Sequence, residues 1–249
     1  MRETVVLTAS SGAFAGLAEA LRDAPVAVVE RPLVSFRPPA DWGQLDAALA
    51  RKSRYRSLAL TSPRAAEAVV QRIRASSIDW DEGVSPTTWA VGAATAAALG
   101  AALGPVRRPD RPPALESSAG GVLAHAMLES RAGSPVLFPC GERHRNELPT
   151  RLREAGIEVD EVVCYRAVLA SSQEAREALV DSSVVVVASP RVVELLADAC
   201  PAATRPRLVA IGPTTAASAQ AAGWLPVAVA EEPSTKALAS AITGLLAPR

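Results

Sequence analysis

Hydroxyl-bearing residues recur where an apolar strand ends and a helix begins. Free backbone N–H groups at a helix N-terminus favour anions, and serine and threonine hydroxyls add donors without adding charge. In open α/β sheets, ligands bind at the carboxyl ends of the strands. The pattern therefore predicts either a shared anion-binding edge or, for each hydroxyl alone, ordinary helix capping. Four segments carry it: Ser62-Pro63, Gly92-x-x-Thr95, Ser189-Pro190 and Gly212-x-x-Thr215.

Further candidates lie beside these segments. Arg143 belongs to the cluster GERHR (141–145), which is either a solvated loop or a clamp for substrate carboxylates. Tyr165 lies in an extended stretch, where it either packs in a strand ladder or faces a ligand. The remaining candidate substrate-binding residues adjoin a strand end or a helix start: Thr61, Ser118, Gly141 and Thr214.

Several other chemistries lack their usual sequence patterns. His125 and His144 have no triad-like or ligand-like partner nearby in sequence, and no Gly-x-Ser-x-Gly or Cys-x-x-Cys occurs. The Gly-x-x-Thr segments lack the lysine and spacing of a P-loop, and no Gly-x-Gly-x-x-Gly marks a dinucleotide site. The formal net charge of zero argues against a nucleic-acid binder. We expect no metal and no cofactor.

The elements that must position these residues occur twice in the chain. Residues 88–106 and 208–230 both run as apolar strand, Gly, two residues, Thr, small-residue helix, Gly, Pro and Val. The stretch 57–70 likewise matches 184–197, and 117–127 loosely matches 234–242. Three elements that recur in one order indicate a duplicated α/β unit. Such a duplication predicts two facing surfaces with a cleft between them.

Counting elements predicts that one of the two units is discontinuous. Strands alternating with helices indicate parallel sheets covered on both faces. Residues 38–162 supply a full set of strands, whereas the second copy has too few without the strand–helix–strand of 1–34. We therefore expect a flavodoxin-like domain of 1–34 plus 169–249, with a second flavodoxin-like domain of 38–162 inserted into it. The crossings 33–37 and 162–168 would pair as a two-stranded hinge.

Two helices are predicted from apolar spacing and from a capping serine. Gly12–Arg22 carries Phe14, Leu17, Ala18 and Leu21 at helical spacing, which predicts one amphipathic helix. A second helix is expected over 117–130, with Ser117 or Ser118 as its cap.

Cysteine usage and hydropathy favour a cytoplasmic, soluble protein. The three cysteines are odd in number and far apart, so no disulfide framework is expected. Residues 84–106 contain no charge, but they are rich in Ala, Gly and Thr and are interrupted by Pro86 and Gly92. A strand, a turn and a buried helix explain this stretch better than a membrane span.

The order and spacing of several segments resemble those of the uroporphyrinogen-III synthase family. The resemblance covers nearly the whole chain and is strongest over 136–168 and 208–243. It is carried by four segments: GERHRNELPTRLREAGIEVDEVVCYRAV (141–168), the strand–Ser-Pro helix that follows, AIGPTTAASAQAAGW (210–224) and EEPSTKALASAI (231–242).

The resemblance implies a lyase of tetrapyrrole (haem, sirohaem or cobalamin) biosynthesis. Members of the family cyclise hydroxymethylbilane, a linear tetrapyrrole with eight carboxylates, with loss of water and inversion of its last pyrrole ring. The resemblance also implies a monomer that works without a cofactor, mainly by controlling the substrate's conformation in the cleft. Tyr165 matches the hinge tyrosine of the family and would assist departure of the hydroxyl group.

Two positions depart from the family pattern. The first strand commonly ends in a Thr-Arg-Pro-like turn, whereas this chain has Thr8-Ala9-Ser10. An arginine often stands where Cys140 is found. Two anion contacts are thus missing, or are replaced by Arg143 and Arg145.

Two alternative functions remain. The first is a non-catalytic tetrapyrrole- or anion-sensing module on the same scaffold, although no DNA-binding appendage accompanies it. The second is a two-lobed sugar or amino-acid receptor. Receptors of that class would be expected to have more aromatic residues in the cleft, and aromatic residues are only 4% of this chain.

Overall fold

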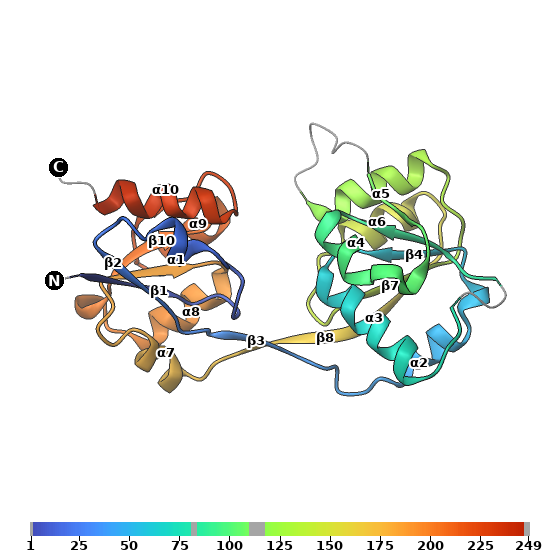
Figure 1. The fold of residues 1–249 in the computed structure, drawn as a ribbon, viewed down its shortest axis with the longest axis horizontal. Coiled ribbons are helices and arrows are strands. Elements are labelled where there is room, and N and C mark those ends of the chain that lie inside the picture. Colours follow the sequence, from blue (N-terminus) through green and yellow to red (C-terminus); the bar gives the residue numbers. More distant parts are fainter. Residues whose placement is uncertain (1, 81–83, 110–117, 247–249) are drawn as a thin grey trace. The chain divides into compact units, whose positions relative to one another are not determined.

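The computed structural model describes residues 2–80, 84–109 and 118–246 (Figure 1). The chain divides into two compact units, one of residues 1–36 with 168–249 (unit 1) and one of residues 37–167 (unit 2). It passes between the units twice, within strand β3 (Val34–Arg37) and within strand β8 (Val159–Leu169). Each unit is described by itself below.

Unit 1 contains a parallel sheet of five strands in the order β11-β10-β9-β1-β2. Alternate residues of β9 point to opposite faces, so Val184 and Val186 enter one core while Val185 and Val187 enter the other. Because helices cover both faces, all four valines are fully buried. The strands are β1 (Glu3–Leu7), β2 (Val26–Glu30), β9 (Val184–Val187), β10 (Arg207–Ala210) and β11 (Pro226–Val229).

The helices of unit 1 fall into two groups, one on each face of the sheet. Residues of α7, α8 and α9 build one core, and residues of α1 and α10 build the other. Their bounds are α1 (Leu17–Ala20), α7 (Ser172–Ala178), α8 (Pro190–Ala199), the short 3₁₀ turn η3 (Ala202–Thr204), α9 (Pro213–Ala221) and α10 (Thr235–Leu246).

The single helix predicted over 12–22 is wrong in length. Only Leu17–Ala20 is α-helical, and turns precede it. Gly12 and Gly16 have φ angles of 71° and 87°, which lie in the left-handed region that glycine adopts without strain. The helical spacing of the apolar residues is real, since Phe14, Leu17 and Leu21 are buried in one core, but the two glycines interrupt the helix.

Unit 2 contains the second sheet, with the strand order β3-β8-β7-β4-β5-β6. Its strands include β4 (Ser57–Leu60), β5 (Thr87–Ala90), β6 (Val106–Arg107) and β7 (Val136–Gly141). Strands β4 to β8 pair in parallel, so the predicted α/β class with parallel sheets is confirmed.

The flavodoxin-like strand order fits only unit 1. Taken in chain order, the strands of unit 1 lie as 2-1-3-4-5, which is the flavodoxin-like arrangement. In unit 2 the chain places β5 and β6 on one side of β4 before it crosses to β7 on the other side. Strands β4 to β8 therefore lie as 3-2-1-4-5, the order of a dinucleotide-binding sheet.

Helices also cover both faces of the sheet in unit 2. Leu58 and Leu60 of β4 enter one core, which α2, α3 and α4 help to form, and Ala59 enters the other, with α5 and α6. The predicted helix over 117–130 is observed from Ala119, and residue 117 lies outside the described residues. The helical elements are α2 (Gly43–Ala50), η1 (Lys52–Arg54), α3 (Pro63–Ala75), α4 (Ala93–Leu99), η2 (Gly100–Leu103), α5 (Ala119–Glu129) and α6 (Glu147–Glu154).

Candidate functional site

The strand order of unit 2 reverses between β4 and β7, and open α/β sheets bind ligands at the carboxyl ends of strands at such a point. The register between the two strands pairs Ser57 with Val136 and Leu58 with Leu137. Val136 donates its N–H to the carbonyl of Glu158, just before β8, so by alternation the backbone nitrogen of Pro139 faces β4. Proline has no N–H to donate, which explains why the ladder stops before the carboxyl ends of β4 and β7.

Tyr165 reaches this edge because the pairing of β7 with β8 is irregular. Cys140 pairs with Val163, but Gly141 pairs with Tyr165, so Cys164 is an extra residue in β8. A bulge of this kind re-aims the side chain that follows it. The half-buried ring of Tyr165 lies directly over Gly141, since a Cβ at that glycine would be 2.7 Å from the ring Cζ. Gly141 therefore provides the space that the ring occupies.

Ser62 meets Tyr165 from the end of β4. Its hydroxyl caps α3 by accepting the N–H of Ala65 at 3.1 Å, and Pro63 occupies the first turn of the helix. The same hydroxyl lies 3.4 Å from the phenol oxygen of Tyr165, to which it donates. Thr61 is half-buried beside it. The structure thus brings together four of the predicted site residues, namely Tyr165, Ser62, Gly141 and Thr61.

The turn after β7 adds cations to this edge. Arg143 and Arg145 are exposed, and neither pairs with an acidic side chain within residues 2–80, 84–109 and 118–246. Exposed guanidinium groups at the carboxyl end of a central strand are suited to carboxylates. The clamp interpretation of GERHR and the solvated-loop interpretation both remain compatible with this geometry.

His144 has partners that the sequence did not reveal. Its Nδ1 lies 3.1 Å from the carbonyl oxygen of Gly141, and its Nε2 lies 2.5 Å from Oε2 of Glu161. Glu161 is 17 residues away and belongs to β8. The pairing of β7 with β8 is the only signal from which this contact could have been inferred.

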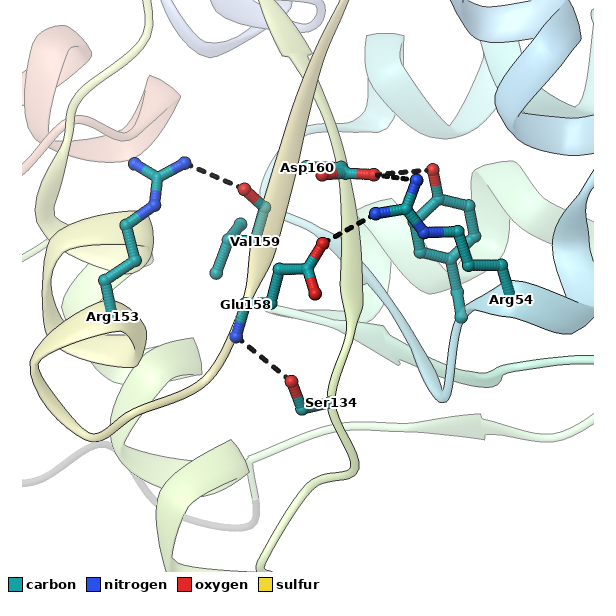
Figure 2. A network of polar contacts seen from close by, with 7 residues as sticks. Arg54, Ser134, Arg153, Glu158, Val159 and Asp160 are labelled. Carbon is teal, nitrogen blue, oxygen red and sulfur yellow. Dashed lines mark hydrogen bonds and ion pairs between the residues drawn. The ribbon is translucent and has the colours of Figure 1, made fainter.

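Polar contacts at the start of β8 fix the strand that carries Tyr165 (Figure 2). Arg54 forms an ion pair with Glu158 at 2.6 Å, and Ser134 Oγ accepts the N–H of Glu158 at 3.0 Å. On the other side, the guanidinium of Arg153 donates to the carbonyl oxygen of Val159 at 2.8 Å. These bonds tie β8 to η1, to the turn before β7 and to α6.

Tyr55 belongs to the same network. Its hydroxyl donates to Asp160 at 2.8 Å. Burial and this hydrogen bond raise the pKa of Tyr55 from its ordinary value to about 12. The residue is a structural tyrosine, in contrast to the half-buried Tyr165 farther along β8.

The other predicted residues of unit 2 lie at helix N-termini. Ser118 caps α5 by accepting the N–H of Gly121 at 3.0 Å. Gly92 precedes α4, and its carbonyl accepts the N–H of Ala96. Thr95 is only 2% exposed, so its side chain packs inside the unit and does not line the open edge.

The corresponding edge of unit 1 repeats this arrangement. Ser189 caps α8 by accepting the N–H of Val192 at 3.4 Å, and Gly212 precedes α9. Thr215 is only 3% exposed, like its counterpart in unit 2. The exposed threonine of this segment is Thr214.

The two departures from the family pattern have different surroundings. Ala9 follows Thr8, whose hydroxyl is fully buried and donates to the carbonyl of Val186 at 2.7 Å. Cys140 is 3% exposed within a core of unit 2. Burial raises the pKa of the thiols of Cys140 and Cys164 to about 12, so both are inert.

Within the described residues there is no group of three or more His, Cys, Asp or Glu placed to hold a metal ion. A helix long and apolar enough to cross a membrane is likewise absent from the described part of the chain. The uncharged stretch 84–106 instead contains β5, α4 and η2.

These features define a protein of two parallel α/β units with hydroxyls, helix N-termini and a tyrosine at the carboxyl edge of a sheet. The family model described as uroporphyrinogen-III synthase HemD matches residues 15–240. The chain belongs to the uroporphyrinogen-III synthase family.

A curated relative supports this assignment. A uroporphyrinogen-III synthase of Synechococcus elongatus is 33% identical over 166 residues, which is 66% of this chain and 61% of the relative. The match thus spans about three fifths of that relative's length.

Two solved structures share the fold. Mutant uroporphyrinogen III synthase of Thermus thermophilus is 17% identical with a TM-score of 0.62, and the match covers 98% of each chain. Uroporphyrinogen-III synthetase of Helicobacter pylori is 18% identical with a TM-score of 0.62, and the match covers 98% of this chain and all of the other.

Proposed function

We propose that this protein cyclises hydroxymethylbilane to uroporphyrinogen III, with inversion of the last pyrrole ring and loss of water. The observation that carries the proposal is the contact of Tyr165 with Ser62 above Gly141. It lies where the strand order of unit 2 reverses. Membership of the family and the match to Thermus and Helicobacter folds support the same function.

The substrate's carboxylates would be bound by helix N-termini, hydroxyls and arginines. In unit 2 we assign this role to the start of α3, a helix of 13 residues, and to Arg143 with its neighbour Arg145. Binding of carboxylates by backbone N–H groups costs little reorganisation because the groups are already held in place. Further proposed contacts are Thr61, Gly92, Ser118 and Gly141 of unit 2 and Ser189, Gly212 and Thr214 of unit 1.

Tyr165 would act on the leaving hydroxyl. As the bond between the hydroxymethyl carbon and its oxygen breaks, the electron pair stays with the oxygen. The phenol proton moves to that oxygen, and water leaves. The adjoining pyrrole nitrogen stabilises the carbon cation, and the proton released after ring closure restores the phenol. Ser62, which donates to the phenol oxygen, would stabilise the transient phenolate.

Selection of the isomer would come from conformational control. The bilane closes without protein to the non-inverted isomer, so the protein must hold a conformer that favours the spiro route. Orientation of the reacting ends is able to supply this preference without an acid–base pair of the usual kind. We also propose a reducing, cytoplasmic location, which agrees with three free cysteines that are all buried.

The test is analysis of the product isomers. The protein is incubated with freshly made hydroxymethylbilane, and the oxidised uroporphyrins are separated. We expect mainly the inverted type III isomer, against type I in a protein-free control. Type I alone, together with saturable binding of the bilane, would instead identify a non-catalytic tetrapyrrole-sensing module.

A further inference from the structure

We propose that His144 is a positioning residue that holds Tyr165 in place through Gly141. This inference rests on the proposed function for its kinetic consequences, although its structural part is independent of activity. His144 lies in the turn between β7 and α6, and its side chain is 21% exposed.

Both ring nitrogens of His144 face acceptors. The backbone carbonyl of Gly141 lies at Nδ1, and the carboxylate of Glu161 lies at Nε2. Neither acceptor carries a hydrogen when Glu161 is ionised, so both contacts are hydrogen bonds only if each nitrogen carries a proton. The neutral ring would retain one of the two bonds and lose the other. The contact that the proposal uses is the one with Gly141, which is a hydrogen bond when Nδ1 carries a proton.

The surrounding groups hold the ring and its partner rigidly. Arg153 of α6 forms an ion pair with the other oxygen of Glu161 at 2.7 Å. The ring of Phe138 of β7 meets the imidazole edge-on, with ring centroids 5.5 Å apart. Burial and then the nearby charge of Glu161 raise the pKa of the thiol of Cys140, which also lies on β7. The charges that face His144 are thus the carboxylate of Glu161 from β8 and, behind it, the guanidinium of Arg153.

The link from His144 to Tyr165 is short and made of two contacts. The carbonyl that His144 holds belongs to Gly141, and the ring of Tyr165 lies on the Cα of that glycine. The next residue, Glu142, donates its N–H to the carbonyl of Tyr165 at 2.9 Å. If the bond from His144 to Gly141 were lost, the turn after β7 could move. The ring of Tyr165, which lies on Gly141, would then move with it. We therefore expect His144 to influence kcat while leaving carboxylate binding unchanged.

Two substitutions separate the two bonds of the ring. The amide nitrogen of asparagine lies near the position of Nδ1, and that of glutamine lies near Nε2. His144→Asn should therefore keep the bond to Gly141, whereas His144→Gln should keep only the bond to Glu161. His125→Gln is the matched control, because this half-buried histidine of α5 pairs only with Glu129 among the residues described here.

The chain has two tyrosines, so 3-fluorotyrosine labelling gives two ¹⁹F signals, which Tyr165→Phe assigns. We expect His144→Gln to shift or broaden the Tyr165 signal while the Tyr55 signal stays in place. We expect kcat to fall about threefold to tenfold, with KM within about twofold, as loss of one hydrogen bond implies. His144→Asn should restore both the signal and kcat to within about twofold of the wild type.

A Tyr165 signal unchanged in His144→Gln, or equal effects of the Asn and Gln substitutions, would overturn the proposal. A wild type that forms only type I isomer contradicts the proposed function, while the ¹⁹F signals still decide the role of His144.

Discussion

The phenol oxygen of Tyr165 lies 3.4 Å from Oγ of Ser62, although 103 positions separate the two residues in the chain. Ser62 begins α3 after β4, and Tyr165 follows a bulge in β8, two strands away. The side chain of Tyr165 spans the intervening strand β7 because Gly141 has no side chain there.

Removal of the Tyr165 hydroxyl should weaken turnover in part. We expect Tyr165→Phe to lower kcat on the order of tenfold with little change in KM, because the hydroxyl acts on the leaving group and not on carboxylate binding. The loss stays below that of an essential acid because the hydroxyl also departs without protein, when the bilane closes to the non-inverted isomer. Steady-state kinetics measures this, and Tyr55→Phe, which should leave kcat unchanged, is the control. Equal kcat for Tyr165→Phe and wild type would remove the phenol from the mechanism.

Ser62→Ala should affect both stability and turnover. Loss of the cap costs about 1 kcal/mol of unfolding free energy, and loss of the donor to Tyr165 should lower kcat about threefold. Ser171 of unit 1 caps α7 by accepting the N–H of Glu174 at 3.2 Å. Ser171→Ala should therefore lose similar stability with kcat unchanged. Urea denaturation and kinetics on both variants separate the two effects, and identical kinetics for both would deny Ser62 a role beyond capping.

Arg143 and Arg145 should contribute to substrate binding. Their replacement by glutamine should raise KM on the order of threefold to tenfold for the pair, with kcat nearly unchanged, because uniform binding is lost. Added salt should reduce the difference between this variant and the wild type. Arg131→Gln, at an exposed arginine in the turn after α5, is the charge-matched control. A KM that does not change in the Arg143/Arg145 variant would favour the solvated-loop interpretation of GERHR.

Tyr55 should ionise at a pH well above that at which an ordinary tyrosine ionises. Its pKa is raised to about 12 by burial and by the bond to Asp160. The neutral phenol of Tyr55 therefore stabilises the folded state. This stabilisation is present in full below about pH 10, the ordinary tyrosine pKa, and is lost as pH rises toward the folded-state pKa of about 12. Ultraviolet titration of Tyr165→Phe, which retains only Tyr55, should show a single late transition. Ionisation of Tyr55 near pH 10 in the folded protein would show that the bond to Asp160 is weak.

The sequence predicted the α/β class well because the elements are locally encoded. Within the repeated segments, the valine run 184–187 forms β9 and residues Thr235–Leu246 form α10. The helix over 12–22 failed because glycine conformation overrode apolar spacing. The flavodoxin-like order failed for unit 2 because strand order depends on where each crossover goes, which local pattern does not record.

The candidate site was predicted as residue types but not as an arrangement. Ser62 and Ser189 were identified from their cap positions, and Tyr165 from the family resemblance. The contact of Tyr165 with Gly141 depends on a bulge, and that of His144 with Glu161 on the register of β7 with β8. The burial of Thr95 and Thr215 was also invisible, since the helical turn that hides them follows from packing.

The most direct test of the central claim is the isomer ratio formed by Gly141→Ala beside the wild type. A Cβ at position 141 would lie 2.7 Å from Cζ and 3.0 Å from the hydroxyl oxygen of Tyr165, so the ring must move. Gly244→Ala, in α10 with no atom within 4 Å of the added carbon, is the control. We predict mainly type III uroporphyrin from the wild type and the control, and a type III yield from Gly141→Ala as low as that of Tyr165→Phe or lower. A Gly141→Ala protein that forms type III at the wild-type rate would contradict the account.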